Sequence, residues 1–181
     1  MSQYKIIFTG PVGAGKTTAI SSISDSPPVK TDASASDMTK NRKSSTTVAM
    51  DYGVMNLDGG EKVHLYGTPG QERFDFMWDI LTTGGIGLIL LLDNTRADPF
   101  QDMRFFLDAF DKFIQSTAVA IGVTQMDLSS RPTVADYHQQ LQTMGVNLKP
   151  PIFAVDAREY NDVSLLVQSL LYSLDPGLQG E

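Results

Sequence analysis

Eight consecutive residues near the amino terminus, Gly10-Pro-Val-Gly-Ala-Gly-Lys-Thr17, have the types and the spacing needed to hold a polyphosphate. They fit the pattern G-x-x-x-x-G-K-[ST], in which glycines let backbone amides converge on anionic oxygens. Lys16 is then expected to contact the β- and γ-phosphates of a nucleoside triphosphate, and Thr17 to offer its hydroxyl to Mg²⁺. The pattern alone leaves kinases, ATPases and GTPases open. The residues predicted to contact the nucleotide here are Gly10, Val12, Gly13, Ala14, Gly15, Lys16, Thr17 and Thr18.

Six segments around this loop have the composition of β-strands. They are rich in β-branched, aromatic and other apolar residues, and they lie at residues 4–9, 48–57, 61–66, 86–93, 118–123 and 152–155. The second and third are joined by Asp58-Gly59-Gly60, which predicts a hairpin. The last three are almost continuously apolar, as is typical of parallel strands covered on both faces.

Helical patterns separate these strands. Helices are predicted at residues 16–24, from Asp98-Pro99 through Ile114, after the capping-box sequence Thr133-x-x-Asp136, and at residues 162–174. Strands that alternate with helices, together with one hairpin, predict an α/β fold. We expect a mostly parallel six-stranded sheet with one antiparallel hairpin strand and helices on both faces.

The bulk composition limits the class of protein. A chain of 181 residues with 41% hydrophobic residues suits a single globular domain over residues 1–181. The formal charge of -7 argues against nonspecific binding to nucleic acid or anionic lipid. The absence of cysteine excludes thiolate metal sites and prenyl or palmitoyl attachment. With no signal-peptide or membrane-spanning pattern, we expect a cytoplasmic protein with no direct membrane anchor.

Four further segments, in their order and spacing, resemble those of Ras-like small GTPases. The polar stretch 25–47 would be the switch I region, and Thr47-Val-Ala-Met-Asp-Tyr52 resembles its end. By that resemblance Thr47 would ligate Mg²⁺ and sense the γ-phosphate, with the neighbouring Thr46 as an alternative. The fold would accordingly be a P-loop NTPase of the small-GTPase type.

The segment Gly67-Thr-Pro-Gly-Gln-Glu-Arg-Phe74 resembles the start of switch II, which would extend over residues 67–83. The resemblance implies that the Gly70 amide reaches the γ-phosphate. It also implies that Gln71 positions the attacking water.

Two segments resemble the base-reading loops of the same family. Asp127, at the end of Thr124-Gln-Met-Asp127, would accept hydrogen bonds from guanine N1 and N2, where adenine offers only a C–H. Asp156-Ala-Arg158 resembles the last base-contacting loop, in which the Ala157 amide would meet guanine O6. The residues predicted to contact the base are therefore Thr124, Gln125, Asp127, Asp156, Ala157 and Arg158.

The resemblance implies a GTP/GDP-controlled switch that hydrolyses GTP slowly and uses Mg²⁺. More narrowly, the segments T-T-V-A-M-D-Y-G and L-Y-G-T-P-G-Q look like those of bacterial MglA-like and conservon-type small GTPases. In those groups a roadblock-fold protein commonly regulates the switch, so a regulator of that type and an effector that binds the switch regions are implied. A hydrolysis-deficient GTP-binding interaction module, or a P-loop kinase or ATPase, remains the alternative.

The chain departs from the family pattern at the magnesium site and in the base-reading loop. Gly67 stands where most Ras-like proteins carry an aspartate near Mg²⁺, and either Asp51 or water alone is expected to cover the deficit. Thr124 and Gln125 replace the usual asparagine and lysine, which predicts weaker tethering between the base loop and the phosphate loop.

Two further residues bear on turnover. Val12 is expected to crowd the γ-phosphate and so to slow hydrolysis. Arg42 is the candidate for a catalytic arginine supplied in cis, which is worth roughly 10³–10⁵ in rate in this chemistry. The equally open alternative is that Arg42 forms a solvated basic cluster with Lys40 and Lys43.

Overall fold

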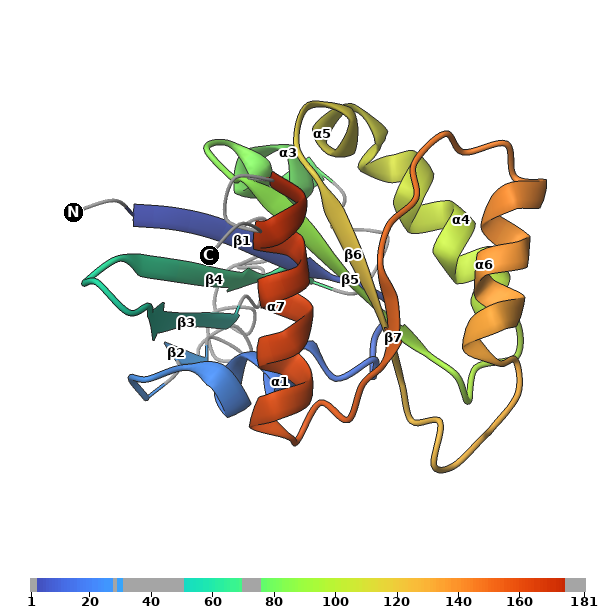
Figure 1. The fold of residues 1–181 in the computed structure, drawn as a ribbon, viewed down its shortest axis with the longest axis horizontal. Coiled ribbons are helices and arrows are strands. Elements are labelled where there is room, and N and C mark those ends of the chain that lie inside the picture. Colours follow the sequence, from blue (N-terminus) through green and yellow to red (C-terminus); the bar gives the residue numbers. More distant parts are fainter. Residues whose placement is uncertain (1–2, 28, 31–50, 70–75, 175–181) are drawn as a thin grey trace, which may run out of the picture.

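The computed structural model of the protein describes residues 3–27, 29–30, 51–69 and 76–174, which form a sheet between two layers of helices (Figure 1). The strands are β1 (Gln3–Thr9), β2 (Val29–Lys30), β3 (Asp51–Asn56), β4 (Lys62–Gly67), β5 (Gly87–Asp93), β6 (Val119–Thr124) and β7 (Ile152–Ala154). They lie in the order β2-β3-β4-β1-β5-β6-β7. β3 pairs antiparallel with β2 and β4, and all other neighbours are parallel.

The predicted α/β fold class is confirmed, and each of the six predicted strands is present. The two-residue strand β2 adds a further antiparallel partner at the edge beside β3. It lies inside the polar stretch 25–47, for which no strand was predicted, and it pairs Val29 with Tyr52 through the backbone. Two residues are too short for a period-2 pattern, so this strand has no signal of its own in the sequence.

The helices are α1 (Lys16–Ile23), α3 (Phe76–Thr82), α4 (Pro99–Ala109), α5 (Asp111–Ser116), α6 (Val134–Thr143) and α7 (Tyr160–Leu174). α1 and α7 lie side by side against one face of the sheet, and α4, α5 and α6 lie against the other (Figure 1). None of the helices in the described residues is long and apolar enough to cross a membrane.

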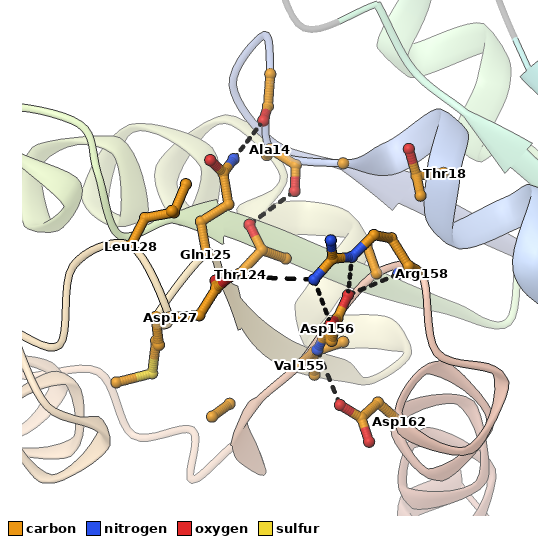
Figure 2. Close-up of a pocket in the computed structure, with 15 residues that line it drawn as sticks. Ala14, Thr18, Thr124, Gln125, Asp127, Leu128, Val155, Asp156, Arg158 and Asp162 are labelled. Atoms are coloured by element: carbon orange, nitrogen blue, oxygen red, sulfur yellow. Dashed lines mark hydrogen bonds and ion pairs between the residues drawn. The ribbon is translucent and has the colours of Figure 1, made fainter.

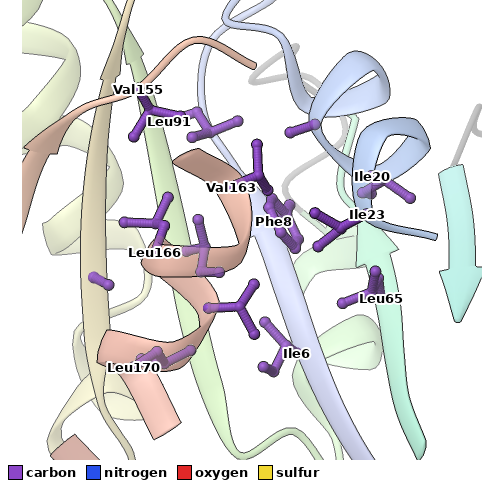
Figure 3. Close-up of a cluster of buried hydrophobic side chains, with 14 of the residues drawn as sticks. Ile6, Phe8, Ile20, Ile23, Leu65, Leu91, Val155, Val163, Leu166 and Leu170 are labelled. Carbon is purple, nitrogen blue, oxygen red and sulfur yellow. The ribbon is translucent and has the colours of Figure 1, made fainter. Parts of the chain in front are cut away.

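The sheet has a separate hydrophobic core on each face. One core joins Ile6 and Phe8 of β1 to α1 and α7 (Figure 3), and the other joins Ile7 to the aromatic residues of α4. Every residue of β5 is buried, with Ile89 and Leu91 in the first core and Leu88, Leu90 and Leu92 in the second. This strand is thus covered on both faces, as its apolar sequence predicted.

The helix caps agree with the sequence, but one predicted helix is broken. Thr133 and Asp136 form a complete capping box at α6. The prediction of one continuous helix through Ile114 is wrong, because α4 ends at Ala109 and α5 begins after Phe110. The Phe110 ring lies at this break and stacks on Trp78 of α3, with 5.0 Å between ring centroids. A tertiary contact of this kind is not encoded in helical periodicity.

Candidate functional site

The loop between β1 and α1 requires glycine where it turns. Gly10 has φ 146°, and a Cβ placed on it would lie 2.1 Å from the carbonyl oxygen of Leu91 on the neighbouring strand β5. Gly13 and Gly15 have φ of 86° and 99°, in the left-handed region that side chains disfavour. The backbone of this loop is therefore shaped by its glycines, at the carboxyl end of the central strand.

Lys16, the first residue of α1, is folded over this loop. Its ammonium donates hydrogen bonds to the carbonyls of Gly10 at 2.6 Å and Pro11 at 2.9 Å, and the residue is 9% exposed. Burial lowers the pKa of Lys16 to about 8, and the nearby Asp51 carboxylate opposes that shift. The loop thus holds a desolvated cation whose charged form would be stabilised by an anionic ligand.

Two contacts join the start of α1 and the end of β1 to neighbouring strands. The Thr17 hydroxyl donates a hydrogen bond to Oδ2 of Asp51, the first residue of β3. The Thr68 hydroxyl, just after β4, donates to the Thr9 hydroxyl at 2.8 Å, and both residues are buried. The phosphate loop is therefore anchored to both strands of the hairpin.

A pocket of about 430 Å³ opens beside the phosphate loop, at the carboxyl ends of β6 and β7 (Figure 2). Three segments line it: the phosphate loop, the residues that follow β6, and the residues that follow β7. The lining residues are Gly13, Ala14, Gly15, Thr18, Thr124, Gln125, Met126, Asp127, Leu128, Ala154, Val155, Asp156, Ala157, Arg158 and Asp162. Ligands of open α/β sheets bind at such carboxyl ends.

Two side chains tie the segment after β6 to the phosphate loop. The hydroxyl of Thr124, which is 2% exposed, donates to the Ala14 carbonyl at 2.8 Å. The amide of Gln125 donates to the Gly13 carbonyl at 2.9 Å, from a backbone with φ 61° (Figure 2). Threonine and glutamine each supply a donor that reaches the loop, so a tether is present, and its expected weakness stays a prediction.

The segment after β7 carries a hydrogen-bonded ion pair. The Asp156 carboxylate accepts from the Arg158 backbone amide at 3.0 Å and from its guanidinium at 2.8 and 2.9 Å. Hydrogen bonding to Arg158 lowers the pKa of Asp156 to about 2. The Asp156 amide in turn donates to Asp162 of α7 at 2.9 Å. Arg158 also lies 4.0 Å from the Asp127 carboxylate, so the two base-side segments meet across the pocket (Figure 2).

A family model described as "conserved hypothetical ATP binding protein" matches residues 8–170, which include both the phosphate loop and this pocket. The chain belongs to this family. The match thus covers nearly all of the described residues.

Several individual relatives are named as Ras-related or GTP-binding proteins. Ras-related protein RabC of Dictyostelium discoideum is 27% identical over 177 residues, which cover 92% of this chain and 83% of the relative. GTP-binding protein YPT1 of Saccharomyces cerevisiae is 25% identical over 90% of this chain and 75% of its own. Ras-related protein Rab-27A of Sus scrofa is 24% identical over 92% and 76%. The relatives support the Ras-like superfamily, while the narrower MglA-like or conservon-type likeness stays a prediction.

The pocket brings together ten of the residues predicted to contact the nucleotide: Gly13, Ala14, Gly15, Thr18, Thr124, Gln125, Asp127, Asp156, Ala157 and Arg158. The predicted residues Gly10, Val12, Lys16 and Thr17 do not line it. Val12 lies in the loop and is 56% exposed. The predicted residues Arg42, Thr47, Gly70 and Gln71 lie outside the described residues. Their roles stay predictions.

Sequence reasoning missed two residues that hold the base side in place. Asp162 accepts the Asp156 amide, as noted above. Asn94, directly after β5, donates to the carbonyls of Ser129 at 2.6 Å and Pro132 at 3.0 Å, and accepts from the Tyr137 hydroxyl at 2.6 Å. A polar residue directly after a buried parallel strand is a signal that could have found Asn94.

Proposed function

We propose that this protein is a small GTPase that works as a GTP/GDP-controlled molecular switch and hydrolyses GTP slowly to GDP and phosphate. The proposal is supported above all by one observation: the phosphate loop and Asp127 line the same pocket, with Thr124 and Gln125 bonded to the loop between them. A nucleotide whose phosphates lie on the loop can therefore present its base to Asp127.

The choice of guanine rests on the chemistry of Asp127. An ionised carboxylate only accepts hydrogen bonds. Guanine presents two donors at its N1 and N2 edge, whereas adenine presents none at the same positions. The Asp127 side chain is 65% exposed, so a base in the pocket can reach it. The description of the family names ATP, whereas the name of the relative YPT1 includes GTP. For this chain the Asp127 carboxylate favours guanine, the base of GTP.

The residues around Thr17 suit a magnesium ion. The Thr17 hydroxyl donates a hydrogen bond to Asp51, and the other Asp51 oxygen is buried without a hydrogen-bond partner among the described residues. Thr17, with Thr47 as predicted, would hold Mg²⁺, which when bound neutralises charge on the phosphate oxygens. Lys16 would leave the carbonyls of Gly10 and Pro11 for the β- and γ-phosphates.

In the proposed reaction Gln71 orients a water molecule, which attacks the γ-phosphorus while the bond to the β–γ bridging oxygen breaks. The amides of the phosphate loop and of Gly70, together with Lys16, stabilise the charge that develops. Arg42 is the candidate for a further positive charge. Val12 is expected to crowd the γ-phosphate, which is the reason to expect slow turnover. Slow turnover in turn suggests a regulator that accelerates hydrolysis, and the resemblance to MglA-like GTPases implies one of the roadblock fold.

The useful output would be conformational. Residues 25–47 and 67–83 would order around the γ-phosphate and relax after its loss, so that an effector reads the two states. We expect the switch to act in the cytoplasm.

One experiment tests the proposal. The protein is stripped of nucleotide and titrated with labelled GTP, GDP and ATP, with and without Mg²⁺, while phosphate release is followed in the same samples. Guanine-selective binding with slow, Mg²⁺-dependent release is the expected result. Guanine binding without release, even with a regulator, would favour the hydrolysis-deficient interaction module. Preferred binding of ATP would overturn the role given to Asp127.

A further inference from the structure

The space beside Gly67 is already filled by a carboxylate from another strand. Gly67 ends β4 and is buried. A Cβ built on it would lie 3.1 Å from Ile20 Cδ1, 3.3 Å from Asp51 Cβ and 3.4 Å from Asp51 Oδ2. A side chain at position 67 would thus point toward α1 and meet Asp51, whose carboxyl group already lies there.

The sheet register explains this placement. Asp51 of β3 lies directly opposite Gly67 of β4 in their antiparallel pairing. Directly opposite residues project their side chains from the same face of a sheet, and here the Cβ position of residue 67 lies only 3.3 Å from Asp51 Cβ. A carboxylate on β3 at this position can therefore reach the same volume as a carboxylate at the end of β4.

The contacts of Asp51 leave one of its oxygens available. Oδ2 accepts a hydrogen bond from the Thr17 hydroxyl, so the lone pairs of the Thr17 oxygen remain free. Oδ1 is buried and has no hydrogen-bond partner within the described part of the chain. A buried carboxylate oxygen without a partner is costly, and such an atom calls for an explanation, a missing water or ion included.

We propose that Asp51 is the positioning carboxylate of the magnesium site in this chain, in place of the residue that Gly67 cannot provide. This inference rests on the proposed function, and it identifies a residue that sets the affinity of the same site for Mg²⁺. Asp51 fixes the Thr17 hydroxyl so that the lone pairs of its oxygen would be left for the cation, and Oδ1 would accept a hydrogen bond from a water molecule of the ion. Mg²⁺ in proteins keeps several of its waters, so a partner of this indirect kind suits it.

A purely structural role makes a different prediction. If Asp51 served only to fasten β3 to α1 through Thr17, its loss would lower the stability of the protein but leave the magnesium dependence of nucleotide retention unchanged. The two roles are separated by measuring nucleotide release at a series of Mg²⁺ concentrations, together with thermal unfolding of the nucleotide-free protein in EDTA.

The experiment follows the release of a fluorescent GDP analogue from wild type and from Asp51→Asn. We expect the Mg²⁺ concentration that half-maximally slows release to rise about 10–100-fold in Asp51→Asn, the usual cost of losing such a partner. Asp108→Asn, which removes one exposed carboxylate of α4, is the matched control and should leave this midpoint unchanged. An unchanged midpoint in Asp51→Asn, with a Mg²⁺-dependent wild type, would overturn the inference and spare the proposed function.

A double variant keeps the test decisive if Asp51→Asn folds poorly. In Asp51→Gly/Gly67→Asp the carboxylate moves across the strand pair into the volume that Asp51 vacates. We expect this variant to bring the midpoint back toward wild type, whereas a midpoint no better than that of Asp51→Gly would count against the site. A wild type that releases GDP equally fast in Mg²⁺ and in EDTA would overturn the proposed function, and this inference with it.

Discussion

On the phosphate side of the pocket, Gly10 lies against the backbone of β5 and Lys16 is 9% exposed, whereas on the base side the Asp127 and Arg158 side chains are 65% and 71% exposed. The first side depends on backbone conformation and on a desolvated charge. The second depends on exposed side chains, of which Arg158 is hydrogen-bonded to Asp156 and lies 4.0 Å from Asp127. Substitutions on the phosphate side should therefore change stability most, and those on the base side should change ligand choice.

The largest effect is expected for Gly10→Ala. Its Cβ would lie 2.1 Å from the Leu91 carbonyl oxygen at φ 146°, so β1 and β5 would have to separate. We expect a loss of about 4 kcal/mol or more in the free energy of unfolding, measured by urea denaturation. Gly59→Ala is the control, because Gly59 has φ 96° but no atom within 4 Å of its Cβ position, and should cost about 1–2 kcal/mol. Equal losses would show that the close approach is unimportant.

Lys16 gives the second prediction, a dependence of stability on pH. Its pKa is lowered to about 8 in the folded protein from the ordinary value of 10.5. Between these values the unfolded chain binds more protons than the folded one, so stability rises with pH. Relative to Lys16→Met, the nucleotide-free wild type in EDTA should gain roughly 2–3 kcal/mol between pH 7 and pH 10.

Urea denaturation at the two pH values measures this gain. Lys112→Met, which removes an exposed lysine of α5, is the control for the loss of one positive charge. A difference between wild type and Lys16→Met that stays constant from pH 7 to pH 10 would refute the assignment of a lowered pKa to buried Lys16.

The third prediction concerns Asp127 on the base side. Asp127→Ala should lower the affinity for GTP by roughly 100-fold, since two hydrogen bonds to a charged acceptor are lost, and should leave the affinity for ATP nearly unchanged. Its midpoint of thermal unfolding should match that of wild type because the side chain is mostly exposed. Equilibrium titration of both nucleotides measures the change, with Asp108→Ala as the control. An equal loss for ATP would contradict base reading by this carboxylate.

The same contrast between the two sides explains what could be predicted from the sequence. The phosphate loop is a local device, since its glycines and Lys16 are adjacent in the chain, and six strands were recognised from their short apolar composition. The fold class followed from strands that alternate with helices, and α6 from its capping box.

Features that depend on distant residues could not be predicted in the same way. The break at Phe110 accompanies stacking on Trp78, and Asn94 bonds to carbonyls 35 and 38 residues further along the chain. The residue types of the base-loop tether differ from the usual pair, and the sequence did not show that the Thr124 and Gln125 side chains both reach the phosphate loop. Hydrogen-bond reach depends on backbone placement, which residue type alone does not give.

These two tethers give the smallest predicted effect and test how far the two sides of the pocket depend on each other. Thr124→Val keeps the shape of the side chain but leaves the Ala14 carbonyl without its 2.8 Å donor in a buried place, which should cost about 1–2 kcal/mol of unfolding free energy. Gln125→Ala removes an exposed bond of similar length and should cost about 0.5 kcal/mol or less. Both are measured by urea denaturation, followed by GTP titration.

If Thr124→Val also weakens GTP binding while Gln125→Ala does not, the buried bond alone sets the position of Asp127 relative to the phosphate loop. Equal losses of stability in the two variants would mean that burial of the tether is irrelevant. In that case the tethers to the phosphate loop would not be what positions Asp127. The hydrogen bonds of Asn94 with the Ser129 and Pro132 carbonyls would position it instead.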